Sequence, residues 1–172
     1  MIFFGGLTPE GARVRIQMQK LGIKAGFEGT SGILNEDFIK TTGAEVAEGS
    51  MCFGEGAPFE KLPGGKEFLA SYQKEGFKDE PEFYGVFAYV AAQLIMDAIE
   101  EVGPDREKVA DALARTDRAS SVIGPIKFDK DGQNVLPVVT AYVAQDGKWT
   151  VWEDSEYASG NRVLPTITYV GA

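Results

Sequence analysis

The chain has 172 residues, of which 44% are hydrophobic and 25% are charged, a composition typical of a soluble globular protein. A net charge of −9 disfavours nucleic acid and anionic lipid as partners, and the absence of histidine excludes the commonest general base and nucleophile–histidine pairs. The single cysteine, Cys52, excludes an intrachain disulfide and is expected to be a small buried hydrophobe. No apolar run is long enough to cross a membrane.

The N-terminal segment is predicted to form a strand, a glycine turn and a helix. Ile2–Phe4 is a short apolar run that ends at a pair of glycines. Thr8 is expected to cap the following helix, with Pro9 at its first position and Gly22 at its left-handed end. The helix is predicted to be amphipathic. Its inward side chains are expected to be Val14, Ile16, Met18 and Leu21, and its solvent-facing ones Arg13, Arg15, Gln17 and Lys20.

Two further strands are predicted before the middle of the chain. Residues 24–30 form the first, after which Asn35 is a good N-cap for a short helix through Ile39. Alternation of small and apolar residues predicts the next strand over residues 46–53. Residues 54–65 contain four glycines and two prolines, which indicates a connecting segment or hinge.

Helices are predicted to dominate the next part of the chain. Apolar spacing gives helices over residues 66–75, 82–102 and 106–116, of which the second is the longest and is expected to be a core helix. Tyr89 is expected to pack in the core. Tyr84 could either pack there or line a ligand cleft.

After residue 120 the apolar pattern changes to a period of two, which predicts antiparallel strands. The expected strands cover residues 123–128, 138–143, 149–152 and 163–170, the last at a sheet edge because of Pro165. The Asp131-Gly132 and Asp146-Gly147 dipeptides are expected to form tight turns.

Two loops at strand ends are candidate ligand sites. Gly5-Gly6-Leu7-Thr8 and Thr30-Ser31-Gly32 each follow a predicted strand, and open α/β sheets bind ligands at the carboxyl ends of their strands. The alternative is a tight turn with a helix cap, which needs the same residues.

The other polar clusters in the sequence are not expected to bind a metal or to catalyse a reaction. Asp129–Asn134 resembles the start of a calcium loop, but Asn134 stands where the glycine is needed and Thr140 where the bidentate acid is needed, so a β-turn is expected and no metal or cofactor. Five acids are interpreted as solvated surface without a catalytic pair. They are Glu55, Glu60, Asp97, Glu100 and Glu101.

Six motifs follow one another along the chain: FFGGLTPEG, KAGFEGTSGILNEDF, AEGSMCFGE, EFYGVFAYVAAQLIMDAIEEVG, SVIGPIKFDKDGQNV and TAYVAQDGKW. In this order they resemble periplasmic solute-binding proteins of the branched-chain amino acid type. The resemblance implies a type I fold of two α/β lobes joined by three hinge crossings, with this sequence matching roughly the C-terminal half. It implies that residues 1–53 form part of one lobe, 54–135 part of the other, and 136–172 strands that cross back.

The resemblance also implies a periplasmic binding protein, without enzymatic activity, that closes around a small polar solute and delivers it to an ABC transporter permease in the membrane. The implied ligand residues are Leu7, Thr8, Thr30, Ser31 and Tyr84. Amino-acid binders of the family often carry an aromatic residue at the Leu7 position and an acid, paired with the ligand ammonium, at the Ser31 position. This sequence has neither, so amides and organic acids stand beside amino acids as expected solutes.

Three alternatives remain at this stage. The same fold serves as a ligand-sensing regulatory domain, and a truncated half could fold without binding a solute. A carboxylate-based hydrolase is disfavoured by the unpaired acids. An apolar edge left uncovered by a missing half predicts a homodimer or a swapped oligomer.

Overall fold

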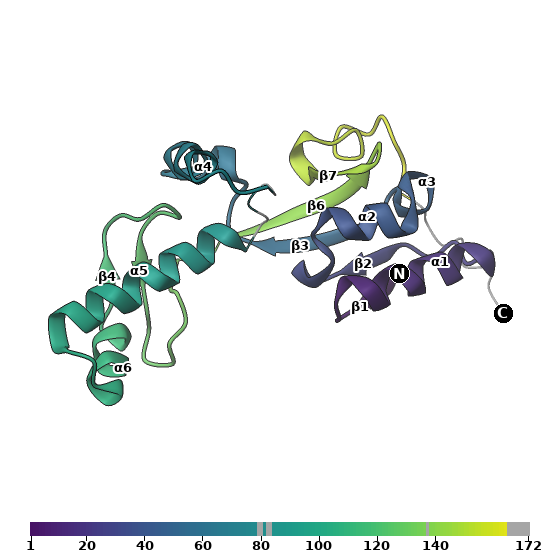
Figure 1. The fold of residues 1–172 in the computed structure, drawn as a ribbon. Helices are drawn as coiled ribbons and strands as arrows, with labels where there is room; N and C mark the ends of the chain where they lie inside the picture. The colour runs from purple at the N-terminus through teal and green to yellow at the C-terminus, as the bar shows by residue number, and fades with distance from the viewer. Residues whose placement is uncertain (79–80, 82–83, 137, 165–172) are drawn as a thin grey trace. The chain divides into compact units, whose positions relative to one another are not determined.

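The computed structural model describes residues 1–78, 81, 84–136 and 138–164, and it divides into two compact units (Figure 1). The sheet unit comprises residues 1–55 together with the chain from Val139 onward. The helical unit comprises Gly56–Val138. The chain therefore passes between the units twice, after Glu55 and after Val138. The sequence-based boundaries lie two or three residues earlier.

The sheet unit contains a five-stranded sheet in the order β1-β2-β3-β6-β7. The strands β1 (Ile2–Phe4), β2 (Phe27–Gly29) and β3 (Met51–Glu55) are parallel. The strands β6 (Val139–Gln145) and β7 (Lys148–Val151) continue the sheet in antiparallel register. The predicted α/β class, mainly parallel with C-terminal antiparallel strands, is confirmed. The carboxyl ends of β1, β2 and β3 consequently share one edge.

A row of stacked and tilted aromatic rings, the aromatic ladder, joins one face of this sheet to a single covering helix. Phe4 stacks on Phe27 and Phe27 on Phe38, each at 6.0 Å between ring centroids, and Phe38 lies 5.6 Å from Trp149. Phe38 belongs to α2 (Glu36–Thr42), whereas the other three rings come from the sheet. The ladder therefore fixes α2 across β1, β2 and β7.

The inward face of the helix α1 (Thr8–Lys20) agrees only in part with the prediction. Arg15, expected in solvent, is buried and donates from Nε to the Ser50 hydroxyl at 3.3 Å, and this burial lowers its pKa. Leu21, expected inside, is 71% exposed. Met18 is buried as predicted, so the inward face is rotated toward Ala12 and Arg15.

Two strand predictions in this unit were too long. The strand expected over residues 24–30 is only the three residues of β2. The segment expected as a strand over residues 46–53 begins inside a one-turn helix, α3 (Ala44–Ala47), before β3. Gly43 and Gly49 bracket this turn with φ of 82° and 73°, values at which glycine is favoured.

Several local predictions in the sheet unit were confirmed. The Asn35 side chain accepts a hydrogen bond from the Phe38 amide and caps α2, which continues three residues beyond the predicted end. Asp146 and Gly147 both have positive φ in the turn between β6 and β7. Gly22 adopts the left-handed conformation after α1, and Cys52 is a buried free thiol.

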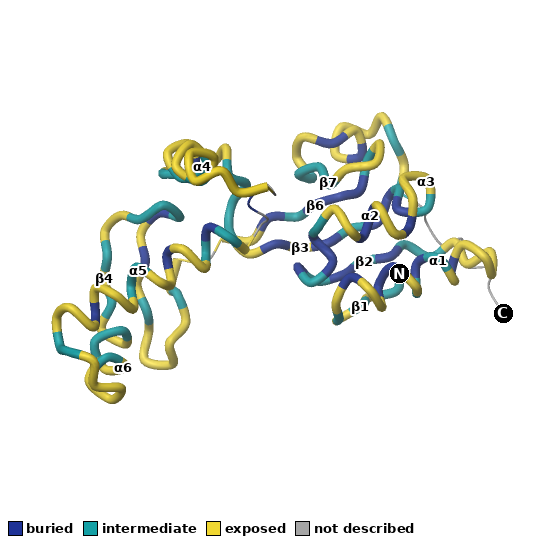
Figure 2. The backbone as a smooth tube through the Cα atoms, viewed as in Figure 1, coloured by how far each residue is buried: buried dark blue, intermediate teal, exposed yellow. Residues whose placement is uncertain are grey.

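The helical unit is less thoroughly buried than the sheet unit. Its elements are η2 (Phe59–Lys61), α4 (Gly65–Lys74), α5 (Gly85–Val102), α6 (Arg106–Ala114), β4 (Asp117–Arg118) and β5 (Ile126–Lys127). The strands β4 and β5 pair antiparallel; β4 was not predicted, and β5 is much shorter than the strand expected over residues 123–128. Figure 2 shows that α5 and α6 are mostly intermediate or exposed.

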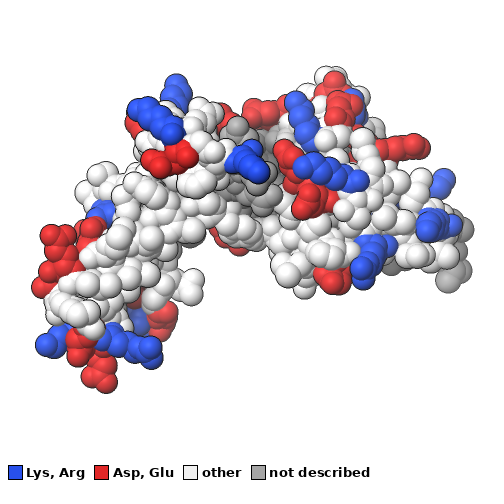
Figure 3. All heavy atoms as spheres, viewed as in Figure 1, with Lys and Arg blue, Asp and Glu red and all other residues white. Residues whose placement is uncertain are grey.

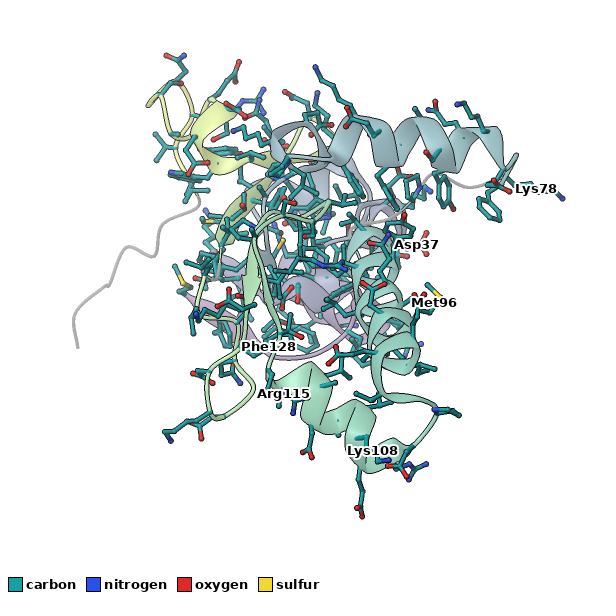
Figure 4. The ribbon with its side chains drawn as sticks, turned by 90° about the vertical axis from the view of Figure 1, so that its left-hand side faces the viewer. Asp37, Lys78, Met96, Lys108, Arg115 and Phe128 are labelled. Atoms are coloured by element: carbon teal, nitrogen blue, oxygen red, sulfur yellow. The ribbon has the colours of Figure 1, made fainter. Side chains whose placement is uncertain are left out.

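The helix α5 was expected to be a core helix, but only some of its side chains are buried. Val86 and Val90 are buried, but Tyr89, predicted in the core, is 45% exposed, and its ring is tilted against that of Phe68 of α4 with 5.4 Å between the ring centroids. Met96 is 60% exposed and projects outward from α5 (Figure 4). In the view of Figure 3, α5 presents a largely uncharged surface with carboxylates gathered at its C-terminal end.

The segment after β7 is held to the sheet unit by an ion-pair cluster around Arg162. Its guanidinium contacts Glu48 at 2.6 Å, Asp146 at 2.8 Å and Glu156 at 2.5 Å. The Tyr157 hydroxyl donates to the same Glu48 Oε1 at 2.6 Å. The edge strand expected over residues 163–170 lies mostly outside the described residues.

Tyr157 is expected to make the free energy of unfolding of the sheet unit decrease as the pH rises in the alkaline range. Burial first, and then the hydrogen bond to Glu48, raise the pKa of Tyr157 from 10.0 to about 12. Because the folded-state pKa lies above the unfolded one, this stabilisation is complete below pH 10 and is lost as the pH rises toward about 12. We expect Tyr157→Phe to be less stable than the parent chain at pH 8, with the difference shrinking at pH 11.

Urea unfolding followed by tryptophan fluorescence measures this difference. Both tryptophans, Trp149 and Trp152, belong to the sheet unit and report on it alone. A gap between the two proteins that stayed constant from pH 8 to pH 11 would contradict the assignment of this pH dependence to Tyr157.

Candidate functional site

Two polar loops and the end of β3 meet at the carboxyl edge of the parallel strands in the sheet unit. The loop after β1 and the loop after β2 are in close backbone contact, because a Cβ on Gly32 would lie only 2.4 Å from the Gly6 carbonyl oxygen. The end of β3 joins them through the side chain of Glu55. Both predicted candidate loops therefore form one cluster.

Thr8 links the first two loops, and its predicted role as helix cap was wrong. Leu7, with extended backbone, occupies the N-cap position, and Thr8 is the first helical residue. The buried Thr8 hydroxyl donates to the Gly32 carbonyl oxygen at 3.2 Å and accepts from the Asn35 side-chain amide at 2.6 Å. Its single donor hydrogen and one of its two lone pairs are used between the loops, and Thr8 lies inside the helix instead of at the N-cap position.

The second loop contains a serine that holds a carboxylate. The Thr30 hydroxyl accepts from the Gly32 amide and caps the short helix η1 (Ser31–Ile33). The Ser31 hydroxyl, in a residue only 9% exposed, donates to Glu55 Oε1 at 2.9 Å. This contact places the carboxylate of Glu55 beside Ser31, the position at which the resemblance led us to look for an acid and at which this sequence has a serine.

Sequence reasoning missed Glu55 as a site residue. It was interpreted as a solvated acid in a connecting segment, whereas the structure makes it the last residue of β3, exposed and hydrogen-bonded to Ser31. Extending the predicted strand by two residues would have brought Glu55 to the same edge as Ser31. The end of the predicted strand was therefore the signal in the sequence that could have identified Glu55 as a site residue.

The other two predicted site residues have different positions. Leu7 is 66% exposed at the mouth of the first loop and offers apolar surface beside the polar cluster. Tyr84 belongs to the helical unit, where it precedes α5 and is 51% exposed. Four of the five predicted residues thus share the sheet unit, and the part of all five in ligand binding stays a prediction.

The cluster supplies groups for binding a small solute. Hydroxyls donate and accept hydrogen bonds, and an ionised carboxylate only accepts them. Within the described residues, no group of three or more metal-ligating side chains occurs. Asp129, at the start of the calcium-like segment, accepts from the Asp131 and Gln133 amides at 2.9 Å each, as in a turn. No helix in the described part of the chain meets the length and hydropathy that spanning a membrane requires.

Comparisons with known proteins agree on one family. The family model described as periplasmic binding protein matches residues 1–148. A Leu/Ile/Val-binding protein homolog 2 of Brucella abortus is 30% identical over 158 residues, which cover 91% of this chain and 40% of the relative. An amino acid binding protein of Pseudomonas aeruginosa is 26% identical over 87% of this chain and 40% of its own length.

Solved structures give the same result. A leucine-binding protein of Thermotoga maritima superposes with a TM-score of 0.75 at 27% identity, covering 87% of this chain and 43% of that one. A branched-chain amino acid transporter substrate-binding protein of Streptococcus pneumoniae, in complex with isoleucine, gives a TM-score of 0.70 at 25% identity over 86% and 42% of the two chains.

The chain spans about 40% of the length of these curated relatives. The family match agrees with the prediction that the protein is a binding protein and not an enzyme. With the ordered motifs, the mainly parallel sheet and the structural matches, it shows that this chain belongs to the periplasmic binding protein family.

Proposed function

We propose that this chain is part of the substrate-binding component of an ABC transporter and acts in the periplasm. The main support for this proposal is that Thr8, Ser31 and Glu55 lie together at the carboxyl edge of β1, β2 and β3. Open α/β sheets bind ligands at this edge. Relatives named for binding leucine, isoleucine and valine support a small amino acid or a related polar solute as the ligand.

The two units support a hinge mechanism for this function. The sheet unit and the helical unit would each form part of a different lobe. The two places where the chain passes from one unit to the other, after Glu55 and after Val138, would act as hinge crossings. A solute bound at the loops of the sheet unit would be enclosed when the lobes close, with Tyr84 as a contact from the other lobe. The closed form would then deliver the solute to a membrane permease.

Leu7 is expected to contact the apolar part of the solute. It is exposed at the N-terminal end of α1, and Leu21 is equally exposed at the other end, at 66% and 71%. The two leucines therefore form a matched pair. Replacing Leu7 with alanine should weaken solute binding, whereas the same change at Leu21 should leave it unaltered.

A thermal-shift screen against amino acids, amides and small organic acids tests the proposal. A solute at a hundred times its dissociation constant stabilises the folded state by about 2.7 kcal/mol. We expect a shift with one chemical class of solute, reduced in Leu7→Ala and retained in Leu21→Ala. A sharp unfolding transition that no solute shifts would show that the chain does not bind a solute of these classes.

A further inference from the structure

Glu55 is the feature of the site that most restricts the chemistry of a ligand. It ends β3 and pairs in register with Val139 of β6, so its backbone is fixed by the sheet. Glu55 is nevertheless exposed, at the edge where the loops after β1 and β2 meet the end of β3. A charged group on a rigid strand end can be presented to a ligand with little loss of conformational entropy.

The hydrogen bond from Ser31 orients this carboxylate without neutralising it. Ser31 is nearly buried and donates to Oε1, which leaves Oε2 and the remaining lone pairs available. Among the described residues, Glu55 has no lysine or arginine at ion-pair distance. Other acids in the same unit differ, since Glu48 and Asp146 are both paired with Arg162.

An oriented, unneutralised carboxylate beside neutral hydroxyls suits a cationic donor. A protonated amine offers three donor hydrogens and a full positive charge, and charge-assisted hydrogen bonds are about twice as strong as neutral ones. A ligand carboxylate at the same place would be repelled. The cluster therefore distinguishes solutes by the presence of an amino group.

We propose that Glu55, held by Ser31, binds the protonated amino group of the solute and makes the site selective for amine-bearing solutes over the corresponding 2-oxo acids. This inference rests on the proposed function, because it names the solute class of the same site. It assigns the negative charge of the site to the end of β3, which no motif in the sequence indicated.

Two substitutions separate the charge from the hydrogen bond. Glu55→Gln keeps the size of the side chain and an oxygen that accepts from Ser31, but removes the charge. Ser31→Ala removes the donor and leaves the charge. Glu45→Gln is the matched control, because Glu45 is an exposed acid on α3, before the opposite end of β3.

Calorimetric titration with isoleucine and with its 2-oxo acid tests the assignment. The two probes share a carboxylate and a side chain and differ in the amino group. We expect the 172-residue chain to prefer isoleucine. Glu55→Gln should weaken isoleucine binding roughly ten- to a hundredfold, the range expected for a hydrogen bond to a charged group, without weakening binding of the oxo acid. Ser31→Ala should have a smaller effect, and Glu45→Gln none.

The outcomes distinguish this inference from the function on which it rests. If either probe binds but Glu55→Gln weakens both equally or neither, the solute-binding function stands and the role of Glu55 is wrong. Preference of the parent chain for the oxo acid leads to the same conclusion. If neither probe binds up to its solubility limit, the proposed binding of such solutes by this chain fails, and the assignment of Glu55 fails with it.

Discussion

Replacing Phe38 with alanine is expected to lower the free energy of unfolding of the sheet unit by about 3–5 kcal/mol, the usual range for a fully buried phenylalanine. Phe38 has no exposed surface and stands between Phe27 and Trp149 in the aromatic ladder. The substitution would remove the apolar ring and leave a cavity between α2 and the sheet. Since the surrounding rings come from separate strands, they cannot close together to fill it.

The measurement is urea unfolding followed by the fluorescence of Trp149 and Trp152. Phe3→Ala is the control, because Phe3 alternates with Phe4 along β1, faces away from the ladder and is 64% exposed. Its substitution should cost less than about 1 kcal/mol. Similar losses in the two variants would show that the ladder does not form the core of the unit.

The second large effect is expected at Gly32, where the two candidate loops after β1 and β2 touch. A methyl group there would lie 2.4 Å from the backbone oxygen of Gly6 and 3.1 Å from the Leu7 side chain. A backbone oxygen cannot rotate away as a side chain can, so the loops must separate. We expect Gly32→Ala to destabilise the unit by about 1–3 kcal/mol, as overpacking does in general, and to weaken solute binding.

Gly5→Ala is the matched control for this prediction. A Cβ at Gly5 has no heavy atom within 4 Å, and its φ lies outside the positive range that disfavours alanine. Its substitution should change stability by less than about 0.5 kcal/mol. Equal stability of the two variants by thermal unfolding would be incompatible with close contact between the loops after β1 and β2.

Features determined by neighbouring residues were predictable from the sequence. The Asn35 cap, the Asp146-Gly147 turn and the left-handed Gly22 each depend on a few adjacent residues, and all three occur as expected. The shared position of the two candidate loops was also predictable, because parallel strands end at a common edge. The fold class followed from the same order of elements.

Features that depend on distant residues were not predictable. Arg15 is buried because it contacts Ser50, 35 positions away, and no helical pattern reveals that partner. The hydrogen bond between Ser31 and Glu55 spans 24 positions and requires β3 to extend to Glu55. Tyr89 looked like a core residue because its neighbours are apolar, but in the described structure nothing fully covers that part of α5.

The predictions for short elements and helix ends were wrong for a different reason. Residues 44–47 form a single helical turn, too short for a helical period to be recognised, and their small apolar residues fit a strand equally well. The positive φ at Gly43 and Gly49 decides between the two conformations. Thr8 was assigned to the helix cap because threonine is a good cap, yet its hydroxyl is engaged by Gly32 and Asn35.

The most direct test of solute binding at the strand edge is an NMR titration of the isotope-labelled chain with isoleucine. If the loops after β1 and β2 and the end of β3 form the site, the largest amide shifts fall on Leu7, Thr8, Ser31, Gly32 and Glu55. Saturating shifts at these positions would establish the site in the sheet unit. Shifts confined to the helical unit, or no shifts at all, would contradict it.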